Sequence, residues 1–473
     1  MKILRSIGCA CISLWLGACA TQAPPPSVPA PVPPHWHAPL PAEDDAARLP
    51  HDGALNGLSQ WWRQQGDPLL VQLIEAAQAI SPTAATASSR IEQARYARVA
   101  AGAALLPSVD ASASISRSNP QPPIPLNTAL QGGVQSSWEL DLFGGNRANR
   151  DAAQARLEGA EAGWHDARVS IAAEVATRYY SLRACDKLAV VTRSDAGSRA
   201  HTARLTQLST EAGFQSPANA ALARASAAEA ASRATQQRAQ CDLDIKALVA
   251  LSGLPEPELR QKIAEVPGVL PQSAAMAITA LPAGTLTQRP DIFSAQREVA
   301  AASADVGSAD AERYPRLSLN GSIAAATVRT GGVTANLETW SIGPLSLTLP
   351  LFDGGRRAAN ADAARARYEE AAALYRASVR QAVREVEEAL VNLDSTAARS
   401  ADAQLAVDGY RTSFFAVEAR YEGGLASLFE LEEARRSRLV AEITLISLQR
   451  DRTAAWIALY RAAGGGWSSP APQ

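Results

Sequence analysis

The chain is an internal duplication, and this feature constrains its fold more than any other. Three landmarks occur twice in the same order, and the offset between copies drifts only from 208 to 211 residues. They are residues 106–109 and 314–317, residues 142–147 and 351–357, and residues 211–216 and 422–427. This period is too long for a solenoid and indicates duplication of a whole domain. Each half is therefore expected to hold the same elements in the same order.

Each half opens with two segments in which apolar and polar residues alternate with period two. These segments are residues 109–116 and 134–142 in the first half, and residues 317–323 and 345–351 in the second. Strands of about ten residues with one apolar and one polar face are typical of a membrane barrel, with lipid outside and water inside. A soluble antiparallel sheet with one dry face is the alternative that this pattern leaves open.

A long proline-free run rich in alanine, arginine and glutamate follows each strand pair, over residues 146–211 and 356–422. A helix of this length extends for roughly 100 Å at 1.5 Å per residue, so it needs a packing partner. A second helical segment follows each run and ends near Leu254 or Ala463. The sequence therefore predicts a long antiparallel hairpin in each half, preceded by a helix over residues 68–105 or 291–313.

The N-terminus has the features of a bacterial secretion signal: Lys2 and Arg5, an apolar stretch over residues 7–16, and a Leu-Gly-Ala-Cys run ending at Cys19. That run resembles a lipobox, after which Cys19 would become the acylated first residue. Two or more acyl chains anchor a protein stably. The alternative is an ordinary signal peptide cut near Ala20. The proline-rich stretch after it is expected to be an extended tether whose histidines, His35 and His37, are solvated.

The predicted organisation has six parts. They are a signal peptide (1–18), a lipidated N-terminus and proline-rich tether (19–60), the first repeat (61–254), a linker (255–290), the second repeat (291–463) and a flexible C-terminal tail (464–473). Four strands cannot close a membrane barrel, because such barrels start at about eight strands. The chain must therefore oligomerise to cover its strand edges, and the strand count does not choose between two copies and three.

The two turns and the two cysteines outside the signal give local predictions. Gly213 and Gly424 permit tight reversals of the chain. In the second turn, residues 427–430 have the form of a capping box, and in the first, residues 216–217 are a serine cap with proline at the first helical position. The midpoint of Cys185 and Cys241 is residue 213, so an antiparallel hairpin brings them level. A disulfide and two free buried thiols both remain open.

Four motifs carry a family resemblance. They are Trp-Trp at 61–62 with Gly-Asp-Pro-Leu at 66–69, Arg-Ile-Glu-Gln-Ala-Arg at 90–95, Trp-Glu-Leu-Asp-Leu-Phe-Gly at 138–144, and Arg-Pro-Asp-Ile at 289–292 with Pro-Arg-Leu-Ser-Leu at 315–319. With them, the sequence resembles the TolC-like outer-membrane efflux proteins, in particular the NodT-like lipoprotein subgroup, over residues 61–463.

The resemblance implies a mainly α-helical fold with a membrane β-barrel part. It implies a homotrimer in the outer membrane with a shared twelve-stranded barrel and a periplasmic helical tunnel. Such a duct passively conducts drugs or other small molecules received from a periplasmic adaptor (membrane fusion) protein and an inner-membrane pump, expected to be of the RND type. Type I protein secretion, metal or aromatic-acid export, and a non-conducting structural lipoprotein are the alternatives.

The resemblance also places site residues at the helical turns. A tunnel-tip gate is expected at Glu430 and Glu433, with the uncharged Asn219 as the equivalent in the first turn. Rings of carboxylates would favour cations, whereas helix capping alone also explains Glu430. Adaptor docking is expected at Gly213, Phe214, Gly424 and Leu425.

The sequence offers no catalytic, cofactor or metal motif. The five histidines are scattered, no glycine-rich phosphate loop precedes a helix, and no cysteine pair has metal-ligand spacing. The formal charge of −2 provides no basic patch for nucleic acid. We therefore expect a protein that is not an enzyme and takes its driving energy from a partner.

Overall fold

The structure is a computed structural model, and it describes residues 23–39, 47–48, 62–63, 66–119, 125–265, 276–277, 286 and 288–467. The predicted signal peptide, the lipidation site Cys19, Trp61 and the end of the predicted tail lie outside the described residues.

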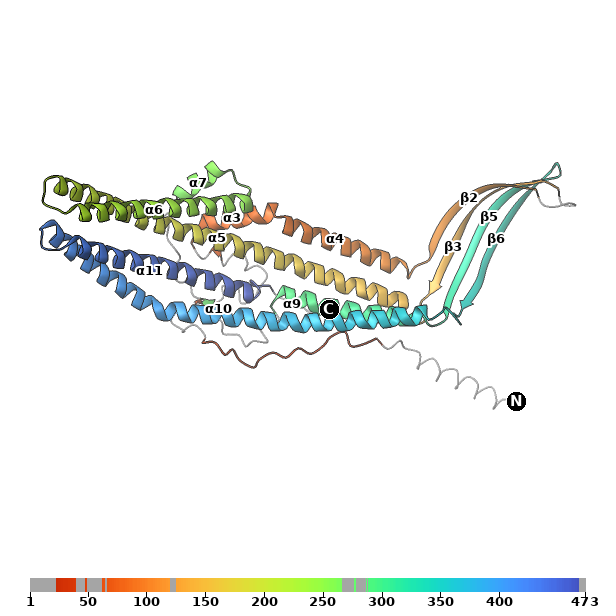
Figure 1. Cartoon of the computed structure of the whole chain (residues 1–473). Coiled ribbons are helices and arrows are strands. Elements are labelled where there is room, and N and C mark those ends of the chain that lie inside the picture. The colour runs from red at the N-terminus through yellow and green to blue at the C-terminus, as the bar shows by residue number, and fades with distance from the viewer. Residues whose placement is uncertain are drawn as a thin grey trace. The chain divides into compact units, whose positions relative to one another are not determined.

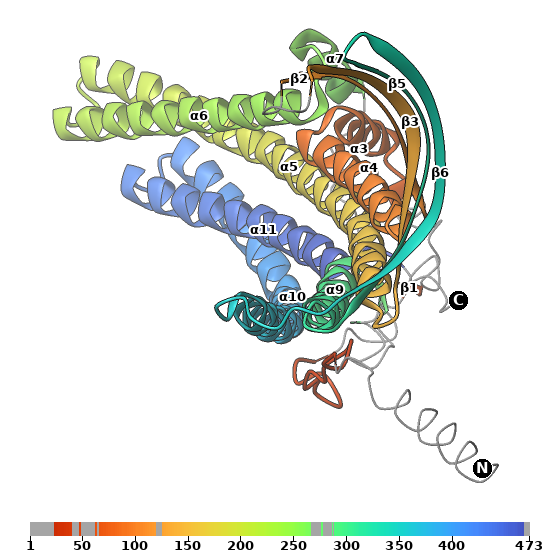
Figure 2. The ribbon, with the colours of Figure 1, turned by 90° about the vertical axis from the view of Figure 1, so that its right-hand side faces the viewer.

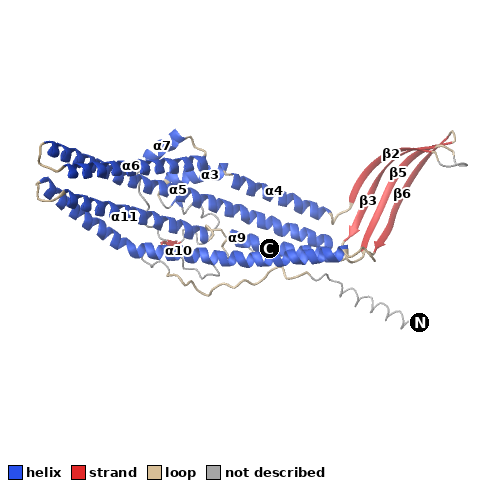
Figure 3. Cartoon of the chain, viewed as in Figure 1, coloured by secondary structure: helices blue, strands red, loops and turns tan. Residues whose placement is uncertain are grey.

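The described part is mainly helical with one strand region, as predicted (Figure 3). Its elements are β1 (Ala47–Arg48), α3 (Pro68–Ile80), α4 (Pro82–Ala103), β2 (Ser108–Ser118), β3 (Asn127–Leu140), α5 (Gly145–Glu211), α6 (Pro217–Ser252), α7 (Glu256–Glu265), β4 (Met276–Ala277), α9 (Pro290–Ala311), β5 (Arg316–Thr330), β6 (Val333–Thr348), α10 (Arg356–Glu422) and α11 (Leu428–Ala462). Both halves run in the same order: helix, strand pair, long hairpin. Helix α7 lies within the predicted linker.

The four long strands form one antiparallel sheet in the order β2-β3-β5-β6, and they lie side by side in Figures 1 and 2. Paired residues form rows across the sheet, and adjacent rows alternate in character. One row is Ala111, Val134, Ile323 and Trp340, and the next is Asp110, Gln135, Ser322 and Ser341. At these rows the sheet therefore has the apolar face and the polar face that the period-two pattern predicts. Farther along β6 the pattern is broken, because Glu338 lies on the apolar face opposite Ala325 and Leu337 lies on the polar face opposite Ala326.

A bulge in β6 keeps that face apolar. In the C-terminal half of β6 the apolar positions change from even (Trp340, Ile342) to odd (Leu345, Leu347), which would turn them to the other face of a regular strand. Ile342 pairs with Gly321 and Leu345 with Leu319, so residues 343–344 oppose a single residue of β5. This extra residue restores the register.

The long helices end where the sequence predicts. Helices α5 and α10 each contain 67 residues, and the returning helices α6 and α11 contain 36 and 35. On these long helices Leu182, Val386 and Leu390 are fully buried, whereas Leu205 is exposed. No helix among the described residues is long and apolar enough to cross a bilayer.

The prediction of one continuous helix over residues 68–105 is wrong. The segment divides into α3 and α4 at Ser81, whose backbone is extended (φ −61°, ψ 125°). Pro82 is the reason, because a proline ring clashes with a helical conformation of the preceding residue. Pro82 instead occupies the first position of α4, where its missing donor is harmless.

The described residues form two compact units, and both units contain parts of both repeats. One comprises residues up to 30, 88–162 and 293–377, and the other comprises residues 31–87, 163–292 and 378–473. The second unit contains the largest apolar core, which includes Trp62, Leu70, Tyr179, Leu390 and Tyr460. The units therefore do not coincide with the two repeats.

Arg289, the first residue of the Arg-Pro-Asp-Ile motif, forms hydrogen bonds with three helices. The buried guanidinium donates to both carboxylate oxygens of Asp291 (3.0 and 2.7 Å), to Glu385 of α10 (2.8 Å) and to the carbonyl of Ala462 (3.0 Å). Hydrogen bonds to charged groups are stronger than neutral ones. One side chain thus connects the start of α9 to α10 and to the end of α11.

The flexible C-terminal tail was predicted to begin at residue 464, but residues 464–467 are buried. Gly464 and Trp467 are buried, and Tyr460 donates to the carbonyl of Gly465 (2.9 Å). A Cβ on Gly464 would lie 2.0 Å from the carbonyl oxygen of Gln288. The chain up to residue 467 therefore belongs to the core of its unit, because three consecutive glycines let it pack closely there.

Candidate functional site at the helical turns

Both hairpins turn through the same backbone motif. In the first turn, Gly213 has φ +80° and donates to Thr210 O (3.0 Å), while Phe214 N donates to Ser209 O (2.8 Å). This pair of bonds is a Schellman motif, which requires a left-handed residue after the helix. The predicted need for glycine at position 213 is therefore met.

The second turn repeats this geometry. Gly424 has φ +71° and donates to Tyr421 O (3.0 Å), and Leu425 N donates to Arg420 O (2.7 Å). The predicted capping box is present, since Ser427 Oγ accepts from Glu430 N (3.2 Å) and Glu430 accepts from Ser427 N (2.7 Å). Ser216 caps α6 in the same way through Asn219 N.

Each turn presents a large apolar side chain to solvent. Phe214 is 85% exposed in the first turn and Leu425 is 74% exposed in the second, and Phe429 on the first turn of α11 is 70% exposed. Exposed apolar residues that gather at one place are typical of a surface for another protein. Phe429 was not among the residues expected from the sequence.

Of the predicted gate residues, Glu430 and Glu433 are exposed and Asn219 is half-buried, and each already has a local partner. Hydrogen bonds from the backbone and side chain of Ser427 hold the pKa of Glu430 below its usual range. Glu433 pairs with Arg436 (3.2 Å), and Asn219 donates to the side chain of Gln215 (2.8 Å). Glu430 and Glu433 lie one turn apart on the same helix face.

A cluster of buried charges connects the two hairpins near these turns. At its centre, the buried carboxylate of Glu432 on α11 pairs with Arg199 of α5. It also accepts hydrogen bonds from Ser226 of α6 (2.6 Å) and from Arg435 of its own helix (3.0 Å). Asp195 holds the other side of Arg199 through two contacts of 3.0 Å. We call these residues, other than Ser226, the buried charge cluster.

Further contacts extend the connection between hairpins. Arg435 donates to Thr202 of α5 (2.8 Å) and pairs with Glu418 of α10 (3.6 Å). The hydroxyls of Thr206 and Tyr421 lie 3.3 Å apart. Since a buried carboxylate or guanidinium is unfavourable without a partner, these groups fix how the second hairpin packs against the first.

The positions of Glu432 and Arg435 in the sequence are a signal for this cluster. On α11 the buried residues Leu428, Leu431 and Leu439 follow helical spacing, and Glu432 and Arg435 lie on the same buried stripe. Charged residues on an apolar stripe are rarely buried unless they are paired. Their positions therefore indicate buried partners, although not which partners.

The structure places a disulfide between Cys185 and Cys241. Their Cα atoms are 5.5 Å apart, and both side chains are buried between α5 and α6. This distance is typical of disulfides. Of the two arrangements left open by the sequence, the structure contains the bridge.

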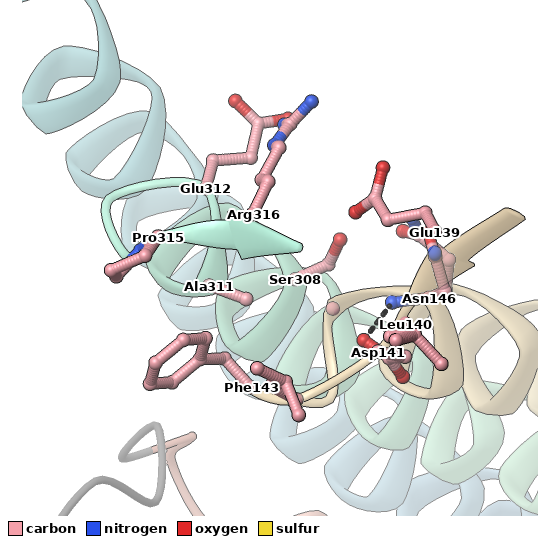
Figure 4. Close-up of a pocket in the computed structure, with 13 residues that line it drawn as sticks. Glu139, Leu140, Asp141, Phe143, Asn146, Ser308, Ala311, Glu312, Pro315 and Arg316 are labelled. Carbon is pink, nitrogen blue, oxygen red and sulfur yellow. Dashed lines mark hydrogen bonds between the residues drawn. The ribbon is translucent and has the colours of Figure 1, made fainter. Parts of the chain in front are cut away.

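A small polar pocket marks the junction between strands and helices in the other unit (Figure 4). Its central carboxylate, Asp141, accepts from the backbone of Asn146 (3.2 Å) and Arg147 (2.9 Å) at the start of α5. In the second repeat, Asp353 accepts from Arg357 N (3.2 Å). These carboxylates cap helix N-termini, so the pocket is a structural junction. No group of three potential metal ligands occurs among the described side chains.

Comparisons with known proteins agree with this architecture. The sequence model of the family described as outer membrane efflux protein matches residues 73–254 and 281–465. The chain is 28% identical over 417 residues to the solvent efflux pump outer membrane protein SrpC of Pseudomonas putida, covering 85% of this chain and 86% of that protein. It is 26% identical over 439 residues to nodulation protein T of Rhizobium leguminosarum bv. trifolii, covering 91% and 92%. The solved outer-membrane channel OprN superimposes with a TM-score of 0.80 at 28% identity, covering 95% of this chain and all of that one.

Proposed function

The chain belongs to the outer membrane efflux protein family and is an outer-membrane channel subunit of an efflux system, and on this premise we propose that it acts as a homotrimer. In this trimer the sheets of neighbouring copies join, and the duct passively conducts small molecules delivered by an RND-type pump and its adaptor. The family consists of channel proteins, and the proposed role needs no catalytic group.

The observation that carries this proposal is the sheet with two open edges. Strands β2 and β6 each have a neighbour on one side only among the described strands. Ile115 of β2 and Trp340 of β6 are each 75% exposed on the apolar face. In lipid, unpaired strand edges are strongly unfavourable, so β6 of one copy is expected to pair with β2 of the next.

Chemical cross-linking and planar-bilayer recording test the duct directly. Protein extracted from membranes in detergent should cross-link as a trimer and give stepwise conductance. Monomers without conductance would refute the duct and favour the structural lipoprotein. Cargo is proposed to be small organic molecules, with support from the name of the relative SrpC, a solvent efflux pump component.

We assign the gate to Glu430 and Glu433. Both are exposed at the start of α11, so symmetric copies would place rings of carboxylates at one level. Replacement of both by glutamine should raise single-channel conductance or remove its cation preference. The matched control is Glu229→Gln, an exposed glutamate that also pairs with an arginine one turn away. Equal traces for the two variants would leave only the capping role.

Adaptor docking is assigned to the turns around Gly213, Phe214, Gly424 and Leu425. The groove between α10 and α11 of the second hairpin supports this, because apart from Arg436 its lining is small or apolar: Ala403, Ala406, Tyr410, Ser437, Val440, Ala441 and Thr444. A Cβ at Gly424 would meet no atom within 4 Å, so a bulky side chain there would project into the proposed docking surface. Gly424→Trp should abolish resistance, while Gly424→Asn, which tolerates a positive φ, should retain it. Efflux retained by both variants would refute this docking surface.

A further inference from the structure

The apolar face of the sheet carries three charged side chains, and two of them lie on the edge strands. Arg117 belongs to β2, Glu338 to β6 and Arg329 to the central strand β5. The ladder places all three on the face that holds Trp340, and all three are exposed in the single chain. The other charged residues of the four strands belong to the polar face: Asp110, Glu139 and Arg316.

The two edge charges face uncharged residues within their own chain. Arg117 pairs with Thr128 and Glu338 pairs with Ala325. Three strand spacings, about 14 Å, separate β2 from β6. The loop after β2, residues 119–126, contains no carboxylate. Because an unpaired charge on a lipid-facing strand is unfavourable, the opposite charge for each group has to come from another molecule.

The edges that carry these charges are the ones that meet in the proposed trimer (Figure 1). Ser108 is the first residue of β2 and Thr348 is the last residue of β6, and both lie at the end of the sheet that joins the helices. The β6 strand of one copy therefore runs antiparallel to β2 of the next. Placing Ser108 opposite Thr348 pairs the whole of β2 and leaves only residues 333–336 of β6 beyond its end.

This register brings the two charges together. Glu338 precedes Thr348 by ten residues, but the bulge at residues 343–344 contributes one extra residue, so Glu338 lies nine ladder positions from Thr348. Arg117 follows Ser108 by nine residues. The two side chains are then directly opposite, and the Cβ atoms of opposite residues in an antiparallel pair lie about 4.5–5.5 Å apart.

Charge complementarity distinguishes this register from its neighbours. A shift of one residue would turn the apolar face of one strand to the other side of the sheet, so the alternatives differ by two residues. They place Arg117 opposite Asn336 or Trp340. In both alternatives Glu338 also faces an uncharged residue, Ile115 or Asn119.

We propose that Glu338 of one copy forms an ion pair with Arg117 of the next copy, and that this pair sets the register in which β6 and β2 join. This inference rests on the proposed trimer with joined sheet edges. Charges on edge strands act against wrong edge-to-edge pairing. Here the two edges carry opposite signs, so each edge attracts the other and repels a second edge of its own kind.

Disulfide trapping measures the register without altering either charge. In the proposed register Ser341 lies opposite Ser114 of the next copy, whereas shifts of two residues place it opposite Ser112 or Ser116. Ser341→Cys is therefore combined with Ser112→Cys, Ser114→Cys or Ser116→Cys, three matched variants at exposed serines. Within one chain these residues of β2 lie at least about 14 Å from Ser341, beyond the reach of a disulfide.

Full-length protein extracted from membranes and oxidised should give several-fold more disulfide-linked trimer from the Ser114 variant than from the other two. A highest yield with Ser112 or Ser116 would overturn the register and the ion pair. Chemical cross-linking of the same samples separates this result from failure of the proposed function. Chemically cross-linked trimers without a disulfide in any variant would overturn the edge register alone, whereas monomers in both assays would overturn the trimer and the ion pair with it.

Charge exchange tests the ion pair itself. Glu338→Arg and Arg117→Glu each place like charges opposite one another, so each should lower the fraction of trimer that survives heating several-fold, and the two together should restore it. The matched control combines Glu338→Arg with Arg329→Glu, because Arg329 is exposed on the same face but lies on a central strand. A double exchange no better than the single variants, or equal rescue by the control, would refute the ion pair.

Discussion

Replacement of Glu432 by leucine removes the acceptor at the centre of the buried charge cluster. The carboxylate has an exposed fraction of 9% and contacts Arg199, Arg435 and Ser226. Leucine is close in size, so the change removes charge and hydrogen bonds while most of the volume stays filled. Two buried guanidinium groups would then lose their shared partner.

The contacts of Glu432 indicate how much stability the Glu432→Leu change should cost. Removing one partner of a buried ion pair costs about 3–5 kcal/mol. Arg199 retains Asp195, and Arg435 retains Thr202 and Glu418. We therefore expect the lower end, about 3 kcal/mol. This corresponds to an increase of roughly a hundredfold in the population in which the hairpins have separated.

Hydrogen exchange measures this population directly. Amides of α5 and α11 beside the cluster should exchange roughly a hundredfold faster in Glu432→Leu protein, because exchange reports local opening. The matched control is Glu433→Leu, the next residue, which is 52% exposed and pairs only with Arg436 among the contacts described. Exposed pairs contribute about 0–1 kcal/mol, so the control should change little.

A double-mutant cycle separates the charge interaction from other effects. Arg199→Leu with Glu432→Leu should be less destabilising than the sum of the single variants, by about 1–3 kcal/mol. Equal exchange in the Glu432→Leu and Glu433→Leu proteins, or additive effects in the cycle, would show that the cluster does not hold the hairpins together.

Three further predictions concern the turns and the core. Replacing Cys185 and Cys241 by serine should lower the free energy of unfolding by about 4 kcal/mol for a bridge across 56 residues; a urea midpoint equal to that of the oxidised wild type would contradict this. Because hydrogen bonds from the turn depress the pKa of Glu430, its stabilising contribution is present above the unfolded pKa, about 4.3, and is lost as the pH falls through the lower folded value. Glu430→Gln should therefore lower the urea midpoint at neutral pH and change it less in acid, whereas a pH-independent difference would exclude the charge. Gly464→Ala should prevent accumulation of folded protein, since its Cβ would lie 2.0 Å from a carbonyl oxygen, whereas Gly213→Ala meets open space and should cost only about 1–2 kcal/mol; equal yields would refute the contact.

The features that the sequence predicted correctly depend on neighbouring residues. Gly213 and Gly424 adopt positive φ, and the capping box over residues 427–430 forms as expected. The wrong prediction of one continuous helix across Ser81 also has a local cause. Pro82 disfavours a helical conformation of Ser81, although the composition of the segment otherwise favours a helix. The resemblance is the basis for proposing Glu430 and Glu433 as gate residues, and the structure shows their local partners, Ser427 and Arg436.

By itself, the sequence determined the duplication, the two-sided strands, the long hairpins and their turns, because periodicity, capping and glycine act over a few residues. Only the tertiary structure revealed the charge cluster and the hydrogen bonds between the proline-rich segment of residues 23–39 and helices α9 and α10. Glu432 and Arg199 are 233 residues apart, and Tyr368 and Pro25 are 343 apart. No local pattern encodes such pairs, because buried charges and proline carbonyls acquire partners only when distant segments pack together.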